Sequence, residues 1–221
     1  MRDMRRCWWA TSDPLYVTYH DHEWGRPATD DHLLYEKLAL EGFQAGLSWL
    51  TILRKRPHFR AAFADFHPAA VARFGARDVR RLLADAGIVR HRGKIEAAIA
   101  NARHVVAAQR EFGSFAAYVW RFAPPAADPP ASRTAIASET EASRALARDL
   151  KTRGFRFVGP TTVYAFMQAM GLVNDHLASC PTRRAVEVAR ARVMRRFPEL
   201  RAAAIVAPWP TSKRFTTAPK K

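Results

Sequence analysis

A histidine and a cysteine stand four residues apart in the stretch NDHLASC, as His176 and Cys180. On a helix this spacing would bring both side chains to one face. A thiolate beside an imidazole is typical of half a metal site, whereas inert burial is the alternative. Cys7 is the other thiol of the chain, and His20 and His22 are the nearest histidines that could complete a set. A Cys2His2 shell would satisfy tetrahedral zinc and, being closed, would be structural.

Aromatic side chains gather in the first fifty residues, in the stretches CWW, PLYVTYHDHEWG and LEGFQAGLSW. Tryptophan is often core, but these stretches also carry histidines and carboxylates, which cores avoid unless the polar groups are paired. Aromatic walls with one carboxylate suit a flat base that is cationic or hydrogen-bonding. Glu41 is a candidate carboxylate because it follows an apolar run and precedes a glycine-containing break. It could line a cleft, or it could be an exposed residue at a helix end.

The charge of the chain indicates a nucleic-acid partner. Lys and Arg number 36 against 20 Asp and Glu, the formal net charge is +16, and 29 of the basic residues are arginine. Arginine binds phosphate with two parallel hydrogen bonds, and a basic excess is the electrostatic footprint of nucleic-acid binding. An arginine-rich composition without a partner is the alternative.

The same composition limits the class of protein. A chain of 221 residues with 48% hydrophobic residues can bury a core. It has no apolar run of the length that a membrane span needs and no apolar N-terminal segment typical of a signal peptide. Two distant cysteines do not form a disulfide framework. We therefore expect a cytoplasmic protein that does not bind membranes, and we expect a monomer.

Helical periodicity runs through nearly the whole sequence, and no alternating strand pattern of any length occurs. Pro57 should end or restart a helix. Residues 123–132, APPAADPPAS, form a Pro-rich break that we expect to be an exposed loop. The fold class predicted from the sequence is all-α.

Residues 146–171 have the pattern of a helix-hairpin-helix. One helix should end at Gly154, and Pro160 should open the next helix at its first turn, where its missing N–H is harmless. The N–H groups of such a hairpin bind a DNA phosphate without reading sequence. The DNA-binding candidates are therefore Gly159, Pro160 and Thr161; an ordinary helix–helix contact is the alternative.

Four blocks of the sequence resemble the DNA-3-methyladenine glycosylase I family: DPLYVTYHDHEWGRP, LEGFQAGLSWLTILRKR, AGIVRHRGKIEAAIANA and RGFRFVGPTTVYAFMQAMGLVNDHLASC. They follow the family's order from about Cys7 to Cys180. The resemblance implies an all-helical helix-hairpin-helix glycosylase fold with a structural zinc that joins the N- and C-terminal segments. It also implies base-excision repair: the enzyme flips 3-methyladenine out of alkylated double-stranded DNA and hydrolyses its N-glycosidic bond, leaving an abasic site.

The resemblance also implies roles for particular residues. Glu41 matches the pocket carboxylate that acts in catalysis, and Gly46 with Leu47 matches the loop that enters the DNA. Asp175 lies near the place where related glycosylases carry an attacking Asp, but we do not assign it that role. The base-binding aromatics implied are Tyr19, Trp49, Trp8 and Trp24. The zinc ligands implied are Cys7, His20, His176 and Cys180.

The chain continues beyond the blocks that carry the resemblance. We divide it into a glycosylase domain at 1–181 and a basic extension at 182–221, predicted to be a helix followed by a flexible tail. The extension holds eight arginines and three lysines against two glutamates. It could add non-specific DNA affinity or be a solvated appendage.

Two other functions remain possible on the sequence alone. A helix-hairpin-helix protein without catalysis would bind DNA and release no base. A zinc hydrolase with another substrate would need an open coordination position at the metal, which a full Cys2His2 shell lacks.

Overall fold

The regular elements of the protein are helices throughout the part of the chain described by the computed structural model, residues 6–10 and 12–196. This confirms the predicted all-α class. No helix in these residues is long and apolar enough to cross a membrane. The elements, in chain order, are α1 Pro14–His22, α2 Asp31–Gln44, α3 Trp49–Ala62, η1 Ala64–Phe66, α4 Pro68–Val71, α5 Ala76–Ala84, α6 Arg92–Phe112, α7 Phe115–Trp120, η2 Arg133–Ala135, α8 Glu141–Thr152, α9 Pro160–Ala169 and α10 Thr182–Arg196.

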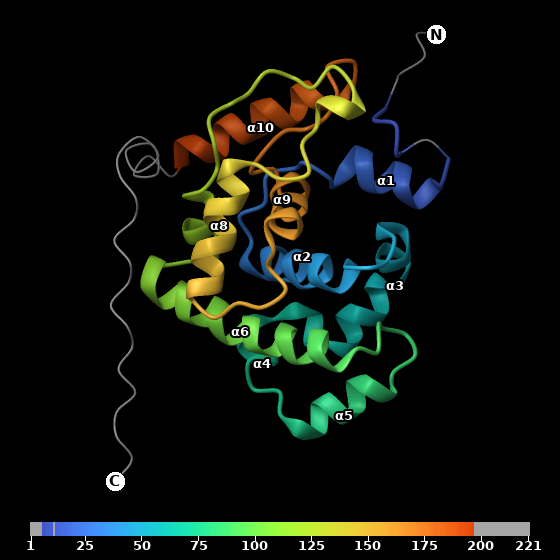
Figure 1. Ribbon diagram of the computed structural model, residues 1–221, viewed down its shortest axis with the longest axis vertical. Coiled ribbons are helices and arrows are strands. Elements are labelled where there is room, and N and C mark those ends of the chain that lie inside the picture. The colour runs from blue at the N-terminus through green and yellow to red at the C-terminus, as the bar shows by residue number, and fades with distance from the viewer. Residues whose placement is uncertain (1–5, 11, 197–221) are drawn as a thin grey trace.

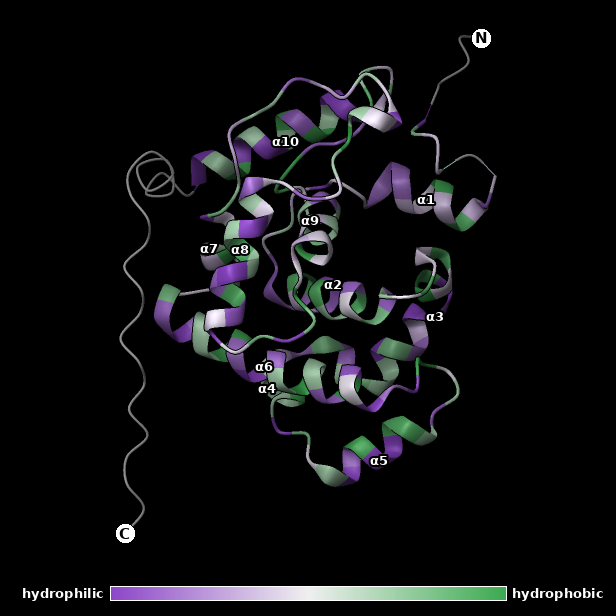
Figure 2. Ribbon diagram, viewed as in Figure 1, coloured by the Kyte–Doolittle hydropathy of each residue, from purple (hydrophilic) through white to green (hydrophobic). Residues whose placement is uncertain are grey.

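Helix α2 runs through the middle of the molecule, where it contacts α3, α6, α7 and α9 (Figure 1). Asp30 caps its N-terminus by accepting a hydrogen bond from the amide of Leu33 at 2.8 Å. Every residue from Leu34 to Phe43 is buried, as is typical of a helix enclosed on all sides. The outer helices are amphipathic: hydrophobic and hydrophilic bands alternate along α5 (Figure 2), where Val79 and Leu82 are buried.

The chain after α1 packs against the end of α9, and two glycines permit the close approach. The amide of Gly25 donates to the carbonyl of Ala169, and that of Ala28 to Met170, both at 3.1 Å. Gly25 and Gly171 have φ of 77° and 72°, in the left-handed region that glycine tolerates. A Cβ at Gly171 would lie 2.6 Å from the Gly25 carbonyl oxygen, so a larger residue would force these two segments apart.

The C-terminal helix α10 lies on the body of the fold. Its residues Val186 and Arg190 are buried. The Arg190 guanidinium donates to the carbonyl of Leu172 at 2.9 Å and to the carbonyl of Pro124, which ties α10 to the end of α9 and to the Pro-rich loop. The flexible tail predicted for about the last dozen residues lies outside the described residues.

One local expectation was wrong, and one argument from helical spacing does not apply. Pro57 lies inside α3 rather than at a helix boundary; buried Leu53 and Phe59 anchor the helix on either side of it. His176 and Cys180 are not on a helix, because residues 174–180 form a loop with a turn before α10. Their side chains meet through this turn and not through helical spacing.

Candidate functional site

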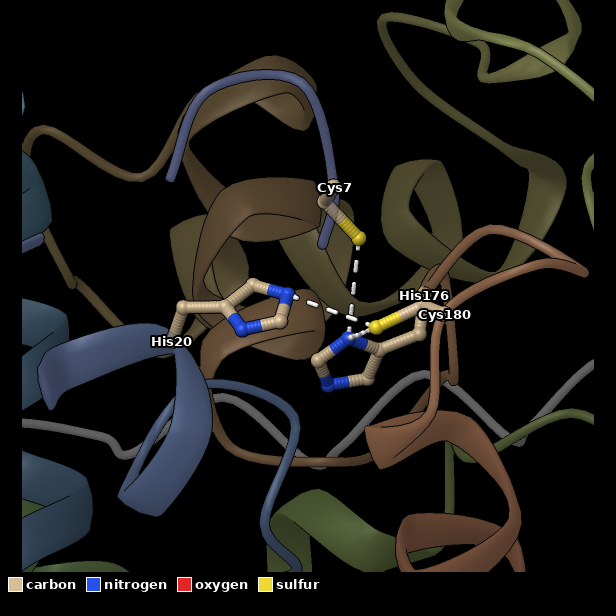
Figure 3. A group of neighbouring side chains, drawn as sticks. All are labelled: Cys7, His20, His176 and Cys180. Atoms are coloured by element: carbon tan, nitrogen blue, oxygen red, sulfur yellow. Dashed lines mark hydrogen bonds between the residues drawn. The ribbon is translucent and has the colours of Figure 1, made fainter. Parts of the chain in front are cut away.

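Four buried side chains converge where the N-terminal segment and α1 meet the loop before α10: Cys7, His20, His176 and Cys180 (Figure 3). Their potential ligand atoms all lie within 4.8 Å of one another. The Cys180 sulfur is 3.6 Å from His20 Nε2 and 3.5 Å from His176 Nδ1. The Cys7 sulfur is 3.6 Å from the same His176 nitrogen. A cluster of this kind could hold a metal ion.

The second nitrogen of each imidazole is also engaged. His20 Nδ1 lies 2.8 Å from an Asp21 carboxylate oxygen, and His176 Nε2 lies 3.2 Å from the Trp24 carbonyl oxygen. Acceptors at these positions fix each ring so that its other nitrogen faces the cluster, as in known metal sites. The pKa of the Cys180 thiol is lowered, first by its contact with Cys7 and then by both imidazoles. The thiolate, which is the form that binds metals, is thereby favoured.

A cavity of about 370 Å³ opens next to this cluster. Its wall combines aromatic rings with one carboxylate and a few neutral polar groups. The N-terminal segment with α1, the α2–α3 region, the loop before α8, and α9 all contribute to it. The lining side chains include Trp8, Trp9, Tyr16, Tyr19, Trp24, Glu41, Gln44, Trp49, Ile136, Ser138, Thr161, Tyr164 and Gln168.

Trp9 is the central ring of the aromatic wall. Its centroid lies 5.5 Å from Tyr16, 5.1 Å from Trp24 and 6.2 Å from Tyr19. Trp8 also lines the cavity but is 39% exposed, with Arg133 above its ring. The Trp49 ring lies 5.6 Å from the Tyr19 ring. The sequence had offered Trp8 as a base-binding residue and had left Trp9 unassigned.

Glu41 is the carboxylate of the cavity, and it is 6% exposed. Its carboxylate forms no hydrogen bond with the residues that the structure describes. Burial raises the pKa of this group to about 7, and the nearby Lys37 ammonium partly opposes the shift. The exposed helix-end interpretation of Glu41 is therefore excluded by its burial. The indole N–H of Trp49 is likewise buried without a partner in the described part of the chain.

Behind the cavity, charged side chains from three segments form a continuous network. The Lys37 ammonium contacts Glu23 at 3.1 Å, and Arg56 contacts the other Glu23 oxygen at 2.6 Å. Arg56 and Arg60 then share the carboxylate of Glu36, at 2.7 and 2.8 Å. The network fixes α3 and the end of α1 on α2, so the aromatic wall and Glu41 keep a defined relation.

Asp175 faces the α9 wall of the cavity through two partners. Its carboxylate accepts hydrogen bonds from the Tyr164 hydroxyl at 2.6 Å and from the Gln168 amide at 2.8 Å. Both partners line the cavity. Asp175 thus orients two wall residues.

The predicted DNA-binding residues fall in two places. Gly46 and Leu47 lie in the turn between α2 and α3, where Gly46 has a φ of 85° and Leu47 is 42% exposed. Gly159 caps the N-terminus of α9, Pro160 is its first residue, and Thr161 also lines the cavity. Thr161 thus lines the cavity, whereas Gly46 and Leu47 are not among its lining residues.

The sequence of the chain is similar to that of known proteins over most of its length. A sequence model described as methyladenine glycosylase matches residues 9–184. The chain belongs to the methyladenine glycosylase family. DNA-3-methyladenine glycosylase 1 of Escherichia coli K12 is 50% identical over 179 residues, which are 80% of this chain and 96% of that protein.

Solved structures give the same result. A crystal structure of 3-methyladenine DNA glycosylase I shares 52% identity with a TM-score of 0.77, covering 80% of this chain and 98% of the other. The Staphylococcus aureus 3-methyladenine DNA glycosylase I, studied for the structural basis of 3-methyladenine recognition, shares 40% identity with a TM-score of 0.78, covering 81% and 97%. The family match ends at residue 184, near the start of α10.

Several wall residues of this family member were not singled out from the sequence. Tyr16 and Trp9 stand in the aromatic N-terminal stretches that drew attention, but nothing in the pattern ranked them above Trp8. Tyr164 and Gln168 are one helical turn apart on α9, so the single amide in an apolar helix was a usable signal. Lys37 gave no signal, because a lysine in a helix is normally solvated.

Proposed function

We propose that this methyladenine glycosylase excises 3-methyladenine from alkylated double-stranded DNA by hydrolysing the N-glycosidic bond, leaving an abasic site. The observation that carries the proposal is the buried carboxylate of Glu41 inside an aromatic cavity, where it has no hydrogen-bond partner among the described residues. A cavity of about 370 Å³ lies at the lower end of the roughly 300–1,000 Å³ typical of small-molecule sites. It suits one flipped base.

Hydrolysis of this N-glycosidic bond requires little catalytic assistance from the protein. 3-Methyladenine is cationic in DNA and is already a good leaving group, so selection and exclusion of water matter most. Tyr19 and Trp49 would stack on the base, with Trp24 and Trp8 beside it. Glu41 would accept a hydrogen bond from the base edge and favour the cationic lesion over neutral adenine. The unpartnered Trp49 N–H is a further donor available to the base.

We propose that the buried cluster holds one structural zinc ion, bound by Cys7, His20, His176 and Cys180. Zn–S and Zn–N bonds of about 2.3 and 2.05 Å in a tetrahedron put sulfur and nitrogen about 3.6 Å apart. Three of the four sulfur–nitrogen distances in the cluster are 3.5–3.6 Å, and all ligand atoms lie within 4.8 Å of one another. The zinc would fill its shell with protein ligands and would supply folding stability. The same four residues hold Trp8, Trp9 and Tyr19 beside the cavity, because these aromatics adjoin ligands in the chain.

We propose that 146–171 acts as a helix-hairpin-helix that binds the DNA backbone. The segment comprises the second half of α8, a turn at 153–159 and α9. Gly159 is the N-cap of α9, and Thr161 is the first residue of the helix with a backbone N–H, because Pro160 has none. Leu47, exposed in the turn between α2 and α3, would enter the space that the flipped base leaves. A monomer in the cytoplasm, with residues 1–181 as the glycosylase domain and 182–221 as a basic extension that assists DNA binding, completes the proposal.

The direct test is base release. Methylated duplex DNA is incubated with the full-length protein, and the freed bases are separated by chromatography. We expect 3-methyladenine well above a no-enzyme control, and Glu41→Gln should release much less while remaining folded. Tight DNA binding without any released base would instead support a non-catalytic helix-hairpin-helix protein.

A further inference from the structure

Lys37 is a fully buried lysine beside the cavity. It lies on α2 one turn before Glu41, and its side chain is 0% exposed. Its ammonium lies 4.5 Å from the centre of the Tyr19 ring and 4.6 Å from that of Trp49. These are the two rings proposed to stack on the base. A charged group in this position is costly to bury, since desolvation of an ion is several kcal/mol even with a partner.

The neighbouring carboxylate of Glu23 does not need Lys37 as a partner. Glu23 already has Arg56 at 2.6 Å, and an apolar side chain of similar length would fill the same space on α2 at a lower electrostatic cost. Glu23, at 3.1 Å, forms an ion pair with the ammonium. A cationic lesion in the cavity would therefore meet a paired and not a free positive charge.

The ammonium directs the Tyr19 hydroxyl. Lys37 Nζ donates a hydrogen bond to the Tyr19 oxygen at 3.0 Å, and an ammonium is a donor that cannot accept. The Tyr19 hydroxyl must therefore act as the acceptor in this contact. Its own hydrogen is left to point away from Lys37 and is available to an acceptor in the cavity that Tyr19 lines.

The ammonium also acts on Glu41 through space. Burial is the larger effect and disfavours the carboxylate, whereas the positive charge of Lys37 favours it. The other charged and titratable groups that act on Lys37 or Tyr19 are Glu23 after α1, Tyr16 on α1 and Arg56 on α3. Of the groups around the cavity, Lys37 is the cation that acts on Glu41.

We propose that Lys37 is a positioning residue of the base-binding site, whose buried ammonium turns the Tyr19 hydroxyl toward the cavity and favours the ionised form of Glu41, one turn away on α2. The inference rests on the proposed function and deepens it. A neutral Glu41 would present a proton to the base edge and would lose its preference for a cationic lesion. Lys37 therefore sets which bases the cavity accepts at neutral pH.

The test compares Lys37→Met with wild type and with Lys55→Met. The control removes one lysine charge from α3, where Lys55 contacts the carbonyls of Ala86 and Gly87 outside the cavity. The titration of the Glu41 carboxyl is followed by carbon NMR in full-length protein, with its signal assigned from Glu41→Gln. Single-turnover release of 3-methyladenine is measured against pH in parallel.

We expect the Glu41 titration in Lys37→Met to move upward by about one pH unit or more, the size of shift that a nearby opposite charge produces. The acid limb of excision should move the same way, so that activity at pH 7 falls by about fivefold. Lys55→Met should titrate like wild type. A role limited to packing would lower activity equally at every pH and leave the titration of Glu41 unchanged, which would overturn the proposal.

A second variant separates charge from hydrogen bonding and guards against loss of the fold. Lys37→Gln can still donate to Tyr19 but carries no charge, so it should shift the Glu41 titration and keep more activity than Lys37→Met at high pH. Failure of both variants to fold would show Lys37 to be structural and would also overturn the proposal. The NMR titration needs no turnover, so it separates failure of this inference from failure of the proposed function.

Discussion

The sulfur of Cys7 lies 3.6 Å from Nδ1 of His176, although 169 residues separate the two in sequence. This contact brings the N-terminal segment against the loop that precedes α10. Trp8 and Trp9 follow Cys7 directly, so the position of the cluster determines the position of one cavity wall. The proposed metal site therefore helps to position the proposed base site, because Trp8 and Trp9 of the cavity wall follow the cluster residue Cys7 directly.

Removal of the metal should therefore lower stability and activity together. We expect Cys180→Ser, or chelation of the wild type, to reduce the free energy of unfolding by about 3 kcal/mol or more, because the buried ligands lose their common partner. In a chain of this size that corresponds to a fall in Tm of roughly 6–12 °C. Circular dichroism melting, metal analysis and base release on the same samples check this.

The contrary outcome identifies a different chemistry. Loss of activity on chelation at unchanged Tm would indicate a metal that acts in the reaction, as in a zinc hydrolase. Ala178→Ser is the control, because it introduces a serine into the same loop and leaves all four cluster residues in place.

Glu41→Gln should stabilise the protein at alkaline pH while it reduces excision. The pKa of Glu41 is raised from its ordinary value of 4.5 to about 7 by burial. Between these pH values the folded protein holds a proton that the unfolded chain has lost, so the free energy of unfolding falls as pH rises through this window. The cost above pH 7 is up to about 3 kcal/mol. Gln removes it, so the gain in Tm should be larger at pH 8 than at pH 5.

Melting curves at both pH values decide the matter. Glu96→Gln, which neutralises a carboxylate on α6 outside the cavity, controls for the change in net charge. A lower Tm for Glu41→Gln at pH 8 would show that Glu41 contributes to the fold and not to a site kept at the expense of stability.

The sequence was sufficient for the features that depend on periodicity and on long motifs. Helical spacing predicted the all-α class, and the four family-like blocks predicted family membership. The loop around Cys180 was not predictable, because a four-residue spacing fits a helix and a turn equally well. Lys37 was missed because its burial depends on Glu23 and Tyr19, which precede it by 14 and 18 residues, and on the packing of α1 against α3. Such contacts exist only in the folded molecule.

Trp9 should matter more to base binding than Trp8. Trp9 forms edge-to-face contacts with Tyr16, Trp24 and His20, and each aromatic pair is worth about 0.5–1.5 kcal/mol beyond its buried area. We expect Trp9→Ala to weaken binding of 3-methyladenine by more than tenfold and Trp8→Ala by less than about threefold. Calorimetric titration with the free base measures both. The reverse order would restore Trp8 as the principal wall residue.

Leu47→Ala should reduce excision from duplex DNA without affecting the cavity. Leu47 is 42% exposed in the turn after α2, so its truncation should change the free energy of unfolding by no more than about 0.5 kcal/mol. An apolar side chain that occupies the space left by the flipped base would lower the cost of unstacking, so its loss should slow release from duplex by roughly tenfold. Release from single-stranded methylated DNA and binding of free 3-methyladenine should stay unchanged, since neither requires unstacking of a pair.

The control is Val188→Ala on α10, where Val188 is 47% exposed. This change removes a similar apolar surface and should leave both release rates and the affinity for the free base unchanged. Equal losses on duplex and single-stranded DNA would place Leu47 outside the flipping step.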